Sequence, residues 1–95
     1  MIDFAGYSYA DHKAAIACSH VLRGAPVLVF VHDEDGDIQF MCGESGHDVD
    51  DAHVVGLTHL LEHIRSMPDI PVVEPGYAAE RSRPGASWIV SPVSE

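Results

Sequence analysis

The dipeptide Asp35-Gly36 constrains this chain more than any other feature, because a β-rich run lies on each side of it. Val27–Glu34 and Asp37–Cys42 combine β-branched and aromatic residues, and Asp-Gly between two such runs is typical of a two-residue type I′ hairpin turn. This turn would pair Val31 with Phe40. The face of the ribbon toward the core would then carry alternate residues of both strands: Val27, Val29, Val31, Ile38, Phe40 and Cys42.

A helix is predicted over the next acidic segment and the apolar run behind it. Asp48–Asp51 supplies acids that favour a helix N-terminus, and Pro68 ends the pattern, so the helix should reach about Arg65. A period of 3.6 residues leaves His59 and His63 exposed and places five apolar residues on one arc: Val54, Leu57, Leu60, Leu61 and Ile64.

Shorter elements are predicted before the hairpin. Residues 1–10 have no clear period and are interpreted as an irregular N-terminal arm. Asp11–Cys18 is compatible with a short helix or with a strand at its apolar end. Ser19–Gly24 is expected to form a single helical turn, with Ser19 as its N-cap and Gly24 in the left-handed conformation that ends it.

Two strands are predicted near the end of the chain, about Tyr77–Arg81 and Ser87–Ser91, joined around Pro84-Gly85. Together the elements predict an α+β fold, in which a small antiparallel sheet built from two hairpins has one main helix packed on one face. The 95 residues are expected to form a single domain, with residues 17–91 as its body.

Charge and composition narrow the classes of partner. Fifteen acidic residues against five basic ones give a formal net charge of −10, which repels phosphate backbones and anionic membranes. We therefore expect no nucleic acid and no membrane, and a basic protein or a cation as the better match. No apolar run approaches the ~20 residues that span a bilayer, and the first residues lack the order of a signal peptide. A cytoplasmic location is expected, with which two cysteines agree.

Four residues have the chemistry of zinc ligands: Cys18, His20, His32 and Cys42. The Cys-x₂₋₄-Cys knuckle that marks a zinc site in a sequence does not occur. Both cysteines follow apolar residues in strand-like runs, so buried free thiols are the expected state. On this ground no metal and no cofactor is predicted.

Two local motifs also suggest metal sites. His59-Leu60-Leu61-Glu62-His63 matches the H-x-x-E-H pattern of inverted zinc peptidases, whose two histidines share a helix face. Those enzymes are several times larger, so an exposed helix face is the favoured interpretation. Asp33–Asp37 looks like a calcium loop, but its acids flank a turn and lack the twelve-residue spacing of an EF-hand.

Four segments, taken together, resemble a family of short bacterial proteins of unknown function and are similar, more loosely, to an immunity-protein-like domain family. The resemblance implies a shared fold, and it implies no catalytic residues. The segments are Cys18-Ser19-x-Val21-Leu22-x-Gly24, Asp35-Gly36-Asp37-x-Gln39-Phe40-x-Cys42-Gly43, Asp50–Leu57 and Gly76-Tyr77-x-Ala79-Glu80-Arg81.

These observations favour a non-enzymatic, acidic binding domain, of the immunity or antitoxin type, that binds another protein. The alternative is a small metal- or ligand-binding protein that uses some of the seven histidines. An enzyme ranks last, because no nucleophile, base and orienting group can be assembled from the sequence. Nothing in the sequence specifies the oligomeric state.

Overall fold

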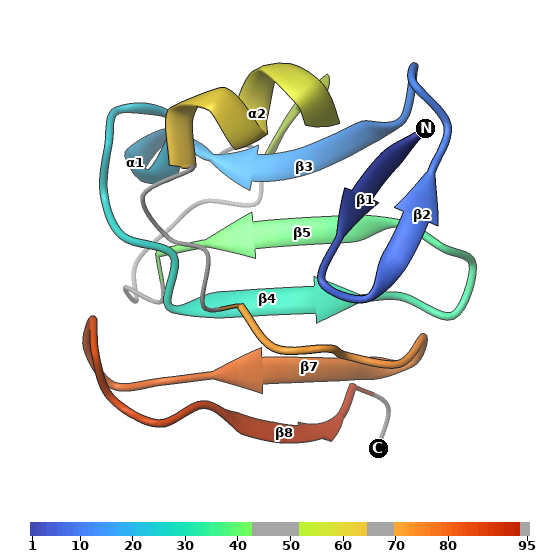
Figure 1. The fold of residues 1–95 in the computed structure, drawn as a ribbon. Coiled ribbons are helices and arrows are strands. Elements are labelled where there is room, and N and C mark those ends of the chain that lie inside the picture. The colour runs from blue at the N-terminus through green and yellow to red at the C-terminus, as the bar shows by residue number, and fades with distance from the viewer. Residues whose placement is uncertain (43–51, 65–69, 94–95) are drawn as a thin grey trace.

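The computed structural model of the chain describes residues 1–42, 52–64 and 70–93. Its centre is a six-stranded mixed sheet in the order β6-β3-β5-β4-β7-β8 (Figure 1). Neighbouring strands are antiparallel except β3 and β5, which run parallel. In chain order the strands are β3 Ala14–Cys18, β4 Val29–His32, β5 Ile38–Met41, β6 Ala52–Gly56, β7 Tyr77–Glu80 and β8 Ile89–Pro92.

The predicted fold class is wrong, because strands dominate and the sheet is neither small nor purely antiparallel. The helices among the described residues are α1, Ser19–Leu22, and α2, Leu57–Ile64, and neither is a main helix covering the sheet. Strands adjacent in sequence form antiparallel hairpins, but β3 and β5 are adjacent in the sheet and not in the sequence. The chain instead leaves β3 through α1, and the β4–β5 hairpin then places β5 between β4 and β3. That insertion creates the parallel pair.

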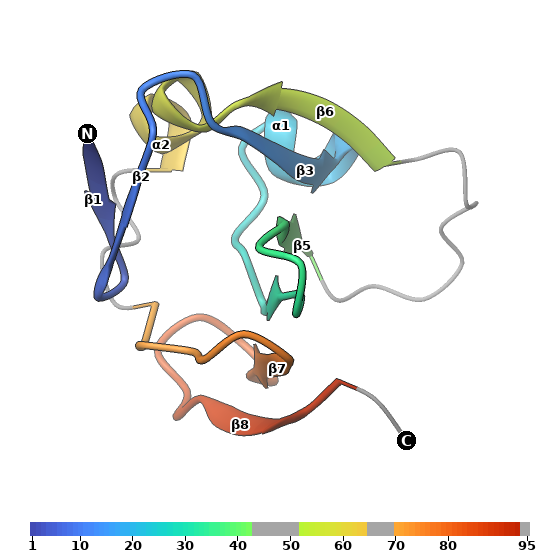
Figure 2. The same ribbon diagram turned by 90° about the vertical axis from the view of Figure 1, so that its right-hand side faces the viewer.

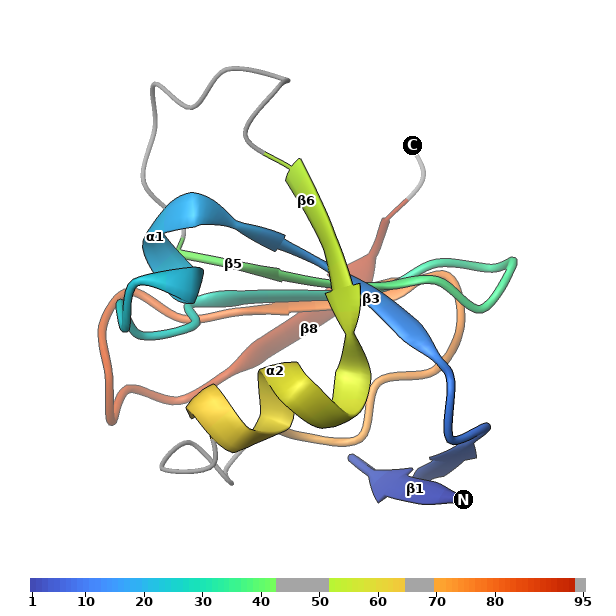
Figure 3. The same cartoon turned by 90° about the horizontal axis from the view of Figure 1, so that it is seen from above.

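The helix predicted from Asp48–Asp51 to Arg65 is wrong over its first half. Ala52–Gly56 forms β6, which pairs with all five residues of β3, and Figure 3 shows β6 leading into α2. Pairing to β3 satisfies the backbone of this β-branched segment, and tertiary pairing of this kind overrides a helical pattern. Residues 48–51 and 65 lie outside the described residues.

Within α2 the predicted apolar face is partly confirmed. Leu57 and Leu60 are completely buried, and Leu61 is half-buried against the core. Val54, predicted on the same arc, belongs to β6 and is 73% exposed. The side chain of Ile64 lies outside the described part of the structure.

Residues 1–10, predicted as an irregular arm, form the hairpin of β1, Ile2–Phe4, and β2, Tyr7–Tyr9. Its two turn residues, Ala5 and Gly6, have φ of 49° and 85°, so the type I′ turn predicted at Asp35-Gly36 occurs here. Figure 2 shows this hairpin and α2 on the same side of the sheet. The hairpin is therefore part of the fold, because it helps to cover the core face.

Other predicted elements are confirmed. β7 and β8 correspond to the late hairpin, β3 to the strand alternative, and α1 to the single helical turn followed by Gly24 at a φ of 104°. The N-cap of α1 is Cys18 rather than Ser19, with no side-chain cap hydrogen bond.

The register of the β4–β5 hairpin differs by one residue from the prediction. The backbone N–H of Asp33 donates to the carbonyl of Asp37 at 2.8 Å, and the N–H of Gly36 donates to the carbonyl of Asp33 at 3.0 Å. The loop therefore has three residues, of which only Gly36 has positive φ, at 96°. As a result Phe30 pairs with Phe40, the partner predicted for Val31.

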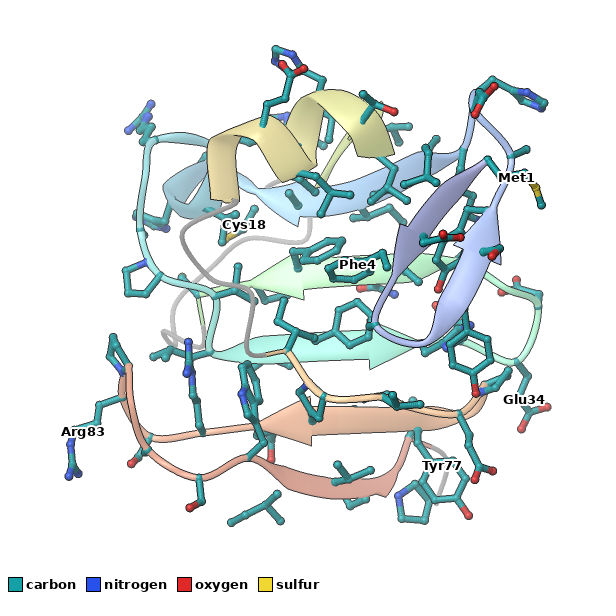
Figure 4. All side chains as sticks on the ribbon, viewed as in Figure 1. Met1, Phe4, Cys18, Glu34, Tyr77 and Arg83 are labelled. Atoms are coloured by element: carbon teal, nitrogen blue, oxygen red, sulfur yellow. The ribbon has the colours of Figure 1, made fainter. Side chains whose placement is uncertain are left out.

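This shift turns β4 over, because neighbouring side chains of a strand point to opposite faces. Phe30 and His32 are buried, at 1% and 4% exposure, whereas Val29 and Val31 are half-buried on the other face. The ring of Phe30 lies 5.1 Å from that of Phe40 and 5.7 Å from that of Phe4. Phe4 reaches these rings from the N-terminal hairpin (Figure 4). The aromatic cluster ties this hairpin to the sheet.

The observed register and the register predicted from the sequence imply opposite results when one side chain of β4 is shortened to alanine. Phe30→Ala is expected to lower the free energy of unfolding by about 3–5 kcal/mol, since it empties a buried aromatic site. Val31→Ala, the matched control on the other face, is expected to cost about 1 kcal/mol. Urea-induced unfolding measures both changes. A larger cost for Val31→Ala would support the two-residue turn instead.

Candidate metal centre

Parallel pairing brings both cysteines to one edge of the sheet. Cys18 is the last residue of β3, and Cys42 follows directly after the last residue of β5. The carboxyl ends of parallel strands meet at the same edge, so two residues 24 positions apart become neighbours. The helix α1 begins immediately after Cys18 and carries His20. Figure 4 shows Cys18 beside α1, at the edge where β3 and β5 both end.

The ligand atoms of Cys18, His20 and Cys42 all lie within 4.8 Å of one another. The Sγ of Cys42 is 3.8 Å from the Nδ1 of His20. The two thiols are buried, at 2% and 4% exposure, as predicted, while His20 is exposed. Two soft sulfur ligands thus lie in the protein, and an imidazole closes the cluster on the solvent side.

His32, the fourth candidate ligand, lies at the other end of the sheet. It pairs with Ile38, the first residue of β5, whereas Cys42 follows the last. Its Nδ1 is 2.7 Å from the carbonyl oxygen of Val73, so Nδ1–H is the donor and this tautomer is fixed by the backbone. His32 therefore holds the segment after residue 70 against β4.

The N-terminal hairpin closes over His32. The ring of Tyr7 meets the imidazole edge-on at 5.0 Å, and the ring of Tyr9 lies at 6.5 Å. Burial raises the pKa of Tyr9 above 10.0, and the neighbouring Tyr7 raises it further. This arrangement is a packed core contact.

The H-x-x-E-H pattern lies on α2 without forming a recognisable site. His59 and Glu62 are exposed, as predicted, and the side chain of His63, predicted to be exposed as well, lies outside the described residues. Neither His59 nor Glu62 joins a group of three metal-ligand side chains among the residues that the structure describes.

A second cluster contains only carboxylates. Oxygens of Asp33, Asp35 and Asp37 lie within 4.8 Å of one another at the β4–β5 turn. They already have partners in the turn, since Gln39 Nε2 donates to Asp33 at 3.0 Å and the N–H of Asp37 donates to Asp35 at 3.2 Å. The ammonium of Lys13 lies 3.9 Å from the carboxylate of Asp37. Turn geometry accounts for this cluster.

Comparison with models of known protein families, with curated proteins and with solved structures finds no match. The resemblance to short bacterial and immunity-protein-like families stays a prediction. Among the described residues, no helix is long and apolar enough to cross a membrane.

The hydrogen bond of His32 to the carbonyl of Val73 is expected to contribute to the stability of the fold. His32→Ala should lower the free energy of unfolding by about 1–3 kcal/mol, because it leaves the carbonyl of Val73 without its buried donor. Urea-induced unfolding measures this cost. His12→Ala, at an exposed histidine, is the control and is expected to stay within about 0.5 kcal/mol of the parent protein. Equal costs for the two variants would contradict the structural role of His32.

Proposed function

We propose that this protein is a non-enzymatic binding domain for a thiophilic d¹⁰ metal ion, with Cys18, His20 and Cys42 as the ligands. The observation that carries the proposal is the meeting of these three ligand atoms within 4.8 Å. Thiolates and a neutral imidazole are the ligands of Zn²⁺ and, for the thiolates, of Cu⁺. Hard cations such as Mg²⁺ and Ca²⁺ require oxygen ligands instead.

The distances require little rearrangement. A tetrahedral Zn²⁺ with Zn–S bonds of about 2.3 Å and Zn–N bonds of about 2.0–2.1 Å holds sulfur and nitrogen about 3.6 Å apart. The separation between Cys42 Sγ and His20 Nδ1 is 3.8 Å. Side-chain rotations that move the sulfur and the nitrogen a few tenths of an ångström closer are thus enough for this pair to share an ion.

Burial and exposure support an exchangeable ion. The thiols lie in the low-dielectric interior, where an uncompensated thiolate is costly and a bound cation removes that cost. Because the imidazole of His20 is exposed, an ion can enter and leave the cluster from solvent on that side. A water molecule suits the fourth position of a three-ligand zinc site, as in zinc sites that keep one position open.

Two rival functions have less support. A basic protein partner is favoured by the net charge of −10, which equally favours a cation, and by the resemblance to immunity-protein-like sequences, which rests on structural rather than binding residues. The Cys42–His20 pair also has the composition of a catalytic dyad. Cys42 is 4% exposed, however, so its sulfur is accessible to a metal ion or another very small molecule and not to the reacting atom of a larger substrate. The second buried thiol, Cys18, adds to a metal site and has no role in such a dyad.

Metal titration of the reduced, untagged protein tests the proposal. We expect one Zn²⁺ or Co²⁺ per chain, and with Co²⁺ a thiolate-to-metal charge-transfer band. Cys18→Ser, Cys42→Ser and His20→Ala should each weaken binding by at least about tenfold, because each removes a ligand. His59→Ala and His32→Ala are the controls and should keep the affinity and the band. Unchanged binding in both cysteine variants, or its loss in His59→Ala, would contradict the proposed ligands.

Metal removal should also change stability. A ligand present at one hundred times its dissociation constant stabilises the folded state by about 2.7 kcal/mol, which raises the melting temperature of a domain of this size by about 10 °C or more. We expect a chelator to lower the melting temperature of the zinc-loaded protein by that amount. The same treatment should leave Cys42→Ser unchanged. An equal fall in both proteins would show that the chelator acts elsewhere.

A further inference from the structure

The two thiols of the metal centre are also a dithiol placed for cross-linking. They are the only cysteines of the chain, and their sulfur atoms lie within 4.8 Å. They sit at the ends of neighbouring strands in which Ala17 pairs with Phe40, so Cys42 lies one residue beyond the position opposite Cys18. A disulfide requires Cα atoms about 4.4–6.8 Å apart and sulfurs about 2.05 Å apart. Rotation of the two side chains, with a small adjustment of the backbone at the strand ends, would close the remaining gap of less than about 3 Å between the sulfurs.

We infer that Cys18 and Cys42 form a reversible intramolecular disulfide, and that this bond and the metal ion exclude each other. The disulfide itself stands on the geometry of the thiols. The exclusion rests on the proposed function, because both states use the same two sulfur atoms. Oxidation would leave only His20 to hold the ion, and one imidazole is no longer a zinc site. The metal centre is thereby regulated by peroxide.

The oxidation proceeds in two balanced steps with hydrogen peroxide as the oxidant. The sulfur of Cys42, which lies 3.8 Å from the exposed imidazole of His20, attacks one peroxide oxygen. The O–O bond breaks, one water leaves, and Cys42 becomes a sulfenic acid. The sulfur of Cys18 then attacks the Cys42 sulfur, the S–O bond breaks, and a second water leaves. Two thiols have lost two electrons and two protons, and one peroxide has been reduced to two waters.

Proximity makes the second step the preferred fate of the sulfenic acid. A resolving thiol held within the protein acts at a high effective concentration, and Cys18 is held there by the pairing of β3 with β5 and β6. Without Cys18, the sulfenic acid lacks its partner and proceeds to sulfinic acid, which thiol reductants do not reverse. The Cys18→Ser variant separates the two fates.

Intact-protein mass and peptide mapping after peroxide treatment test the inference. Trypsin cleaves after Lys13, Arg23 and Arg65, so Cys18 and Cys42 fall in different peptides, 14–23 and 24–65. The metal-free parent protein should lose the mass of two hydrogen atoms, yield these peptides cross-linked, and return to its first mass with dithiothreitol. Cys18→Ser should instead gain oxygen at Cys42, and dithiothreitol should not remove it.

Zinc should protect the dithiol. At one hundred times the dissociation constant only about 1% of the protein is metal-free, so cross-linking should slow about one hundredfold. His20→Ala keeps both thiols but removes a ligand, so zinc should protect it far less, whereas zinc should protect the His59→Ala control as well as it protects the parent protein. Oxygen addition at the cysteines of the parent protein without the cross-linked peptides would overturn the inference and leave metal binding intact. Cross-linking that zinc does not slow would instead reject the shared site, and a failed metal titration alongside it would reject the proposed function.

Discussion

Parallel pairing of β3 with β5 is the constraint on which the candidate centre depends. Had β5 run antiparallel to β3, Cys18 and Cys42 would lie at opposite ends of their strands, about the length of a strand apart. Because the strands are parallel, both cysteines reach the same edge, and α1 adds His20 within two residues of Cys18. The ligand set is therefore a consequence of topology. A parallel pair requires a long connection, and here α1 and the whole of β4 provide it.

Much of the secondary structure could be predicted from the sequence, and the register of the hairpin could not. The β-rich runs on either side of Asp35-Gly36 do form β4 and β5. Whether the loop holds two residues or three depends on where left-handed backbone occurs, and Asp-Gly is compatible with both loops. That single residue decides whether Phe30 or Val31 enters the core. Once Phe30 is inside, the aromatic ring of Phe4 has a surface to cover, and residues 1–10 gain a place in the fold.

In the segment from Ala52 to Ile64, the spacing of apolar residues alone is not enough to predict the secondary structure. Its second half follows the predicted helix, with Leu57 and Leu60 in the core. Its first half contains the same kind of apolar residue at helical spacing, yet it pairs with β3 along five residues. Pairing with β6 satisfies the backbone groups along this edge of β3, which a helix at the same place would leave to solvent. The strand that decides between helix and strand for this segment lies 34 to 42 residues earlier in the sequence, so no local pattern contains this information.

The candidate centre was predictable in its residue types and not in its geometry. Cys18, His20 and Cys42 have the right chemistry, but the spacing of a zinc knuckle is a local signal, and this cluster is assembled by a sheet. The local signal that does occur is on α2, where His59 and Glu62 are exposed. The net charge of the chain affects which ions come near the centre. A formal charge of −10 raises the concentration of every cation near the surface. The carboxylates of the β4–β5 turn can attract hard cations such as Ca²⁺, which prefer oxygen ligands. The buried sulfur atoms of the two cysteines do not attract hard cations in this way, because thiolates prefer d¹⁰ ions such as Zn²⁺ and Cu⁺. The acidic surface therefore attracts cations without discrimination, and selection among them falls to the two thiols at the edge of the sheet.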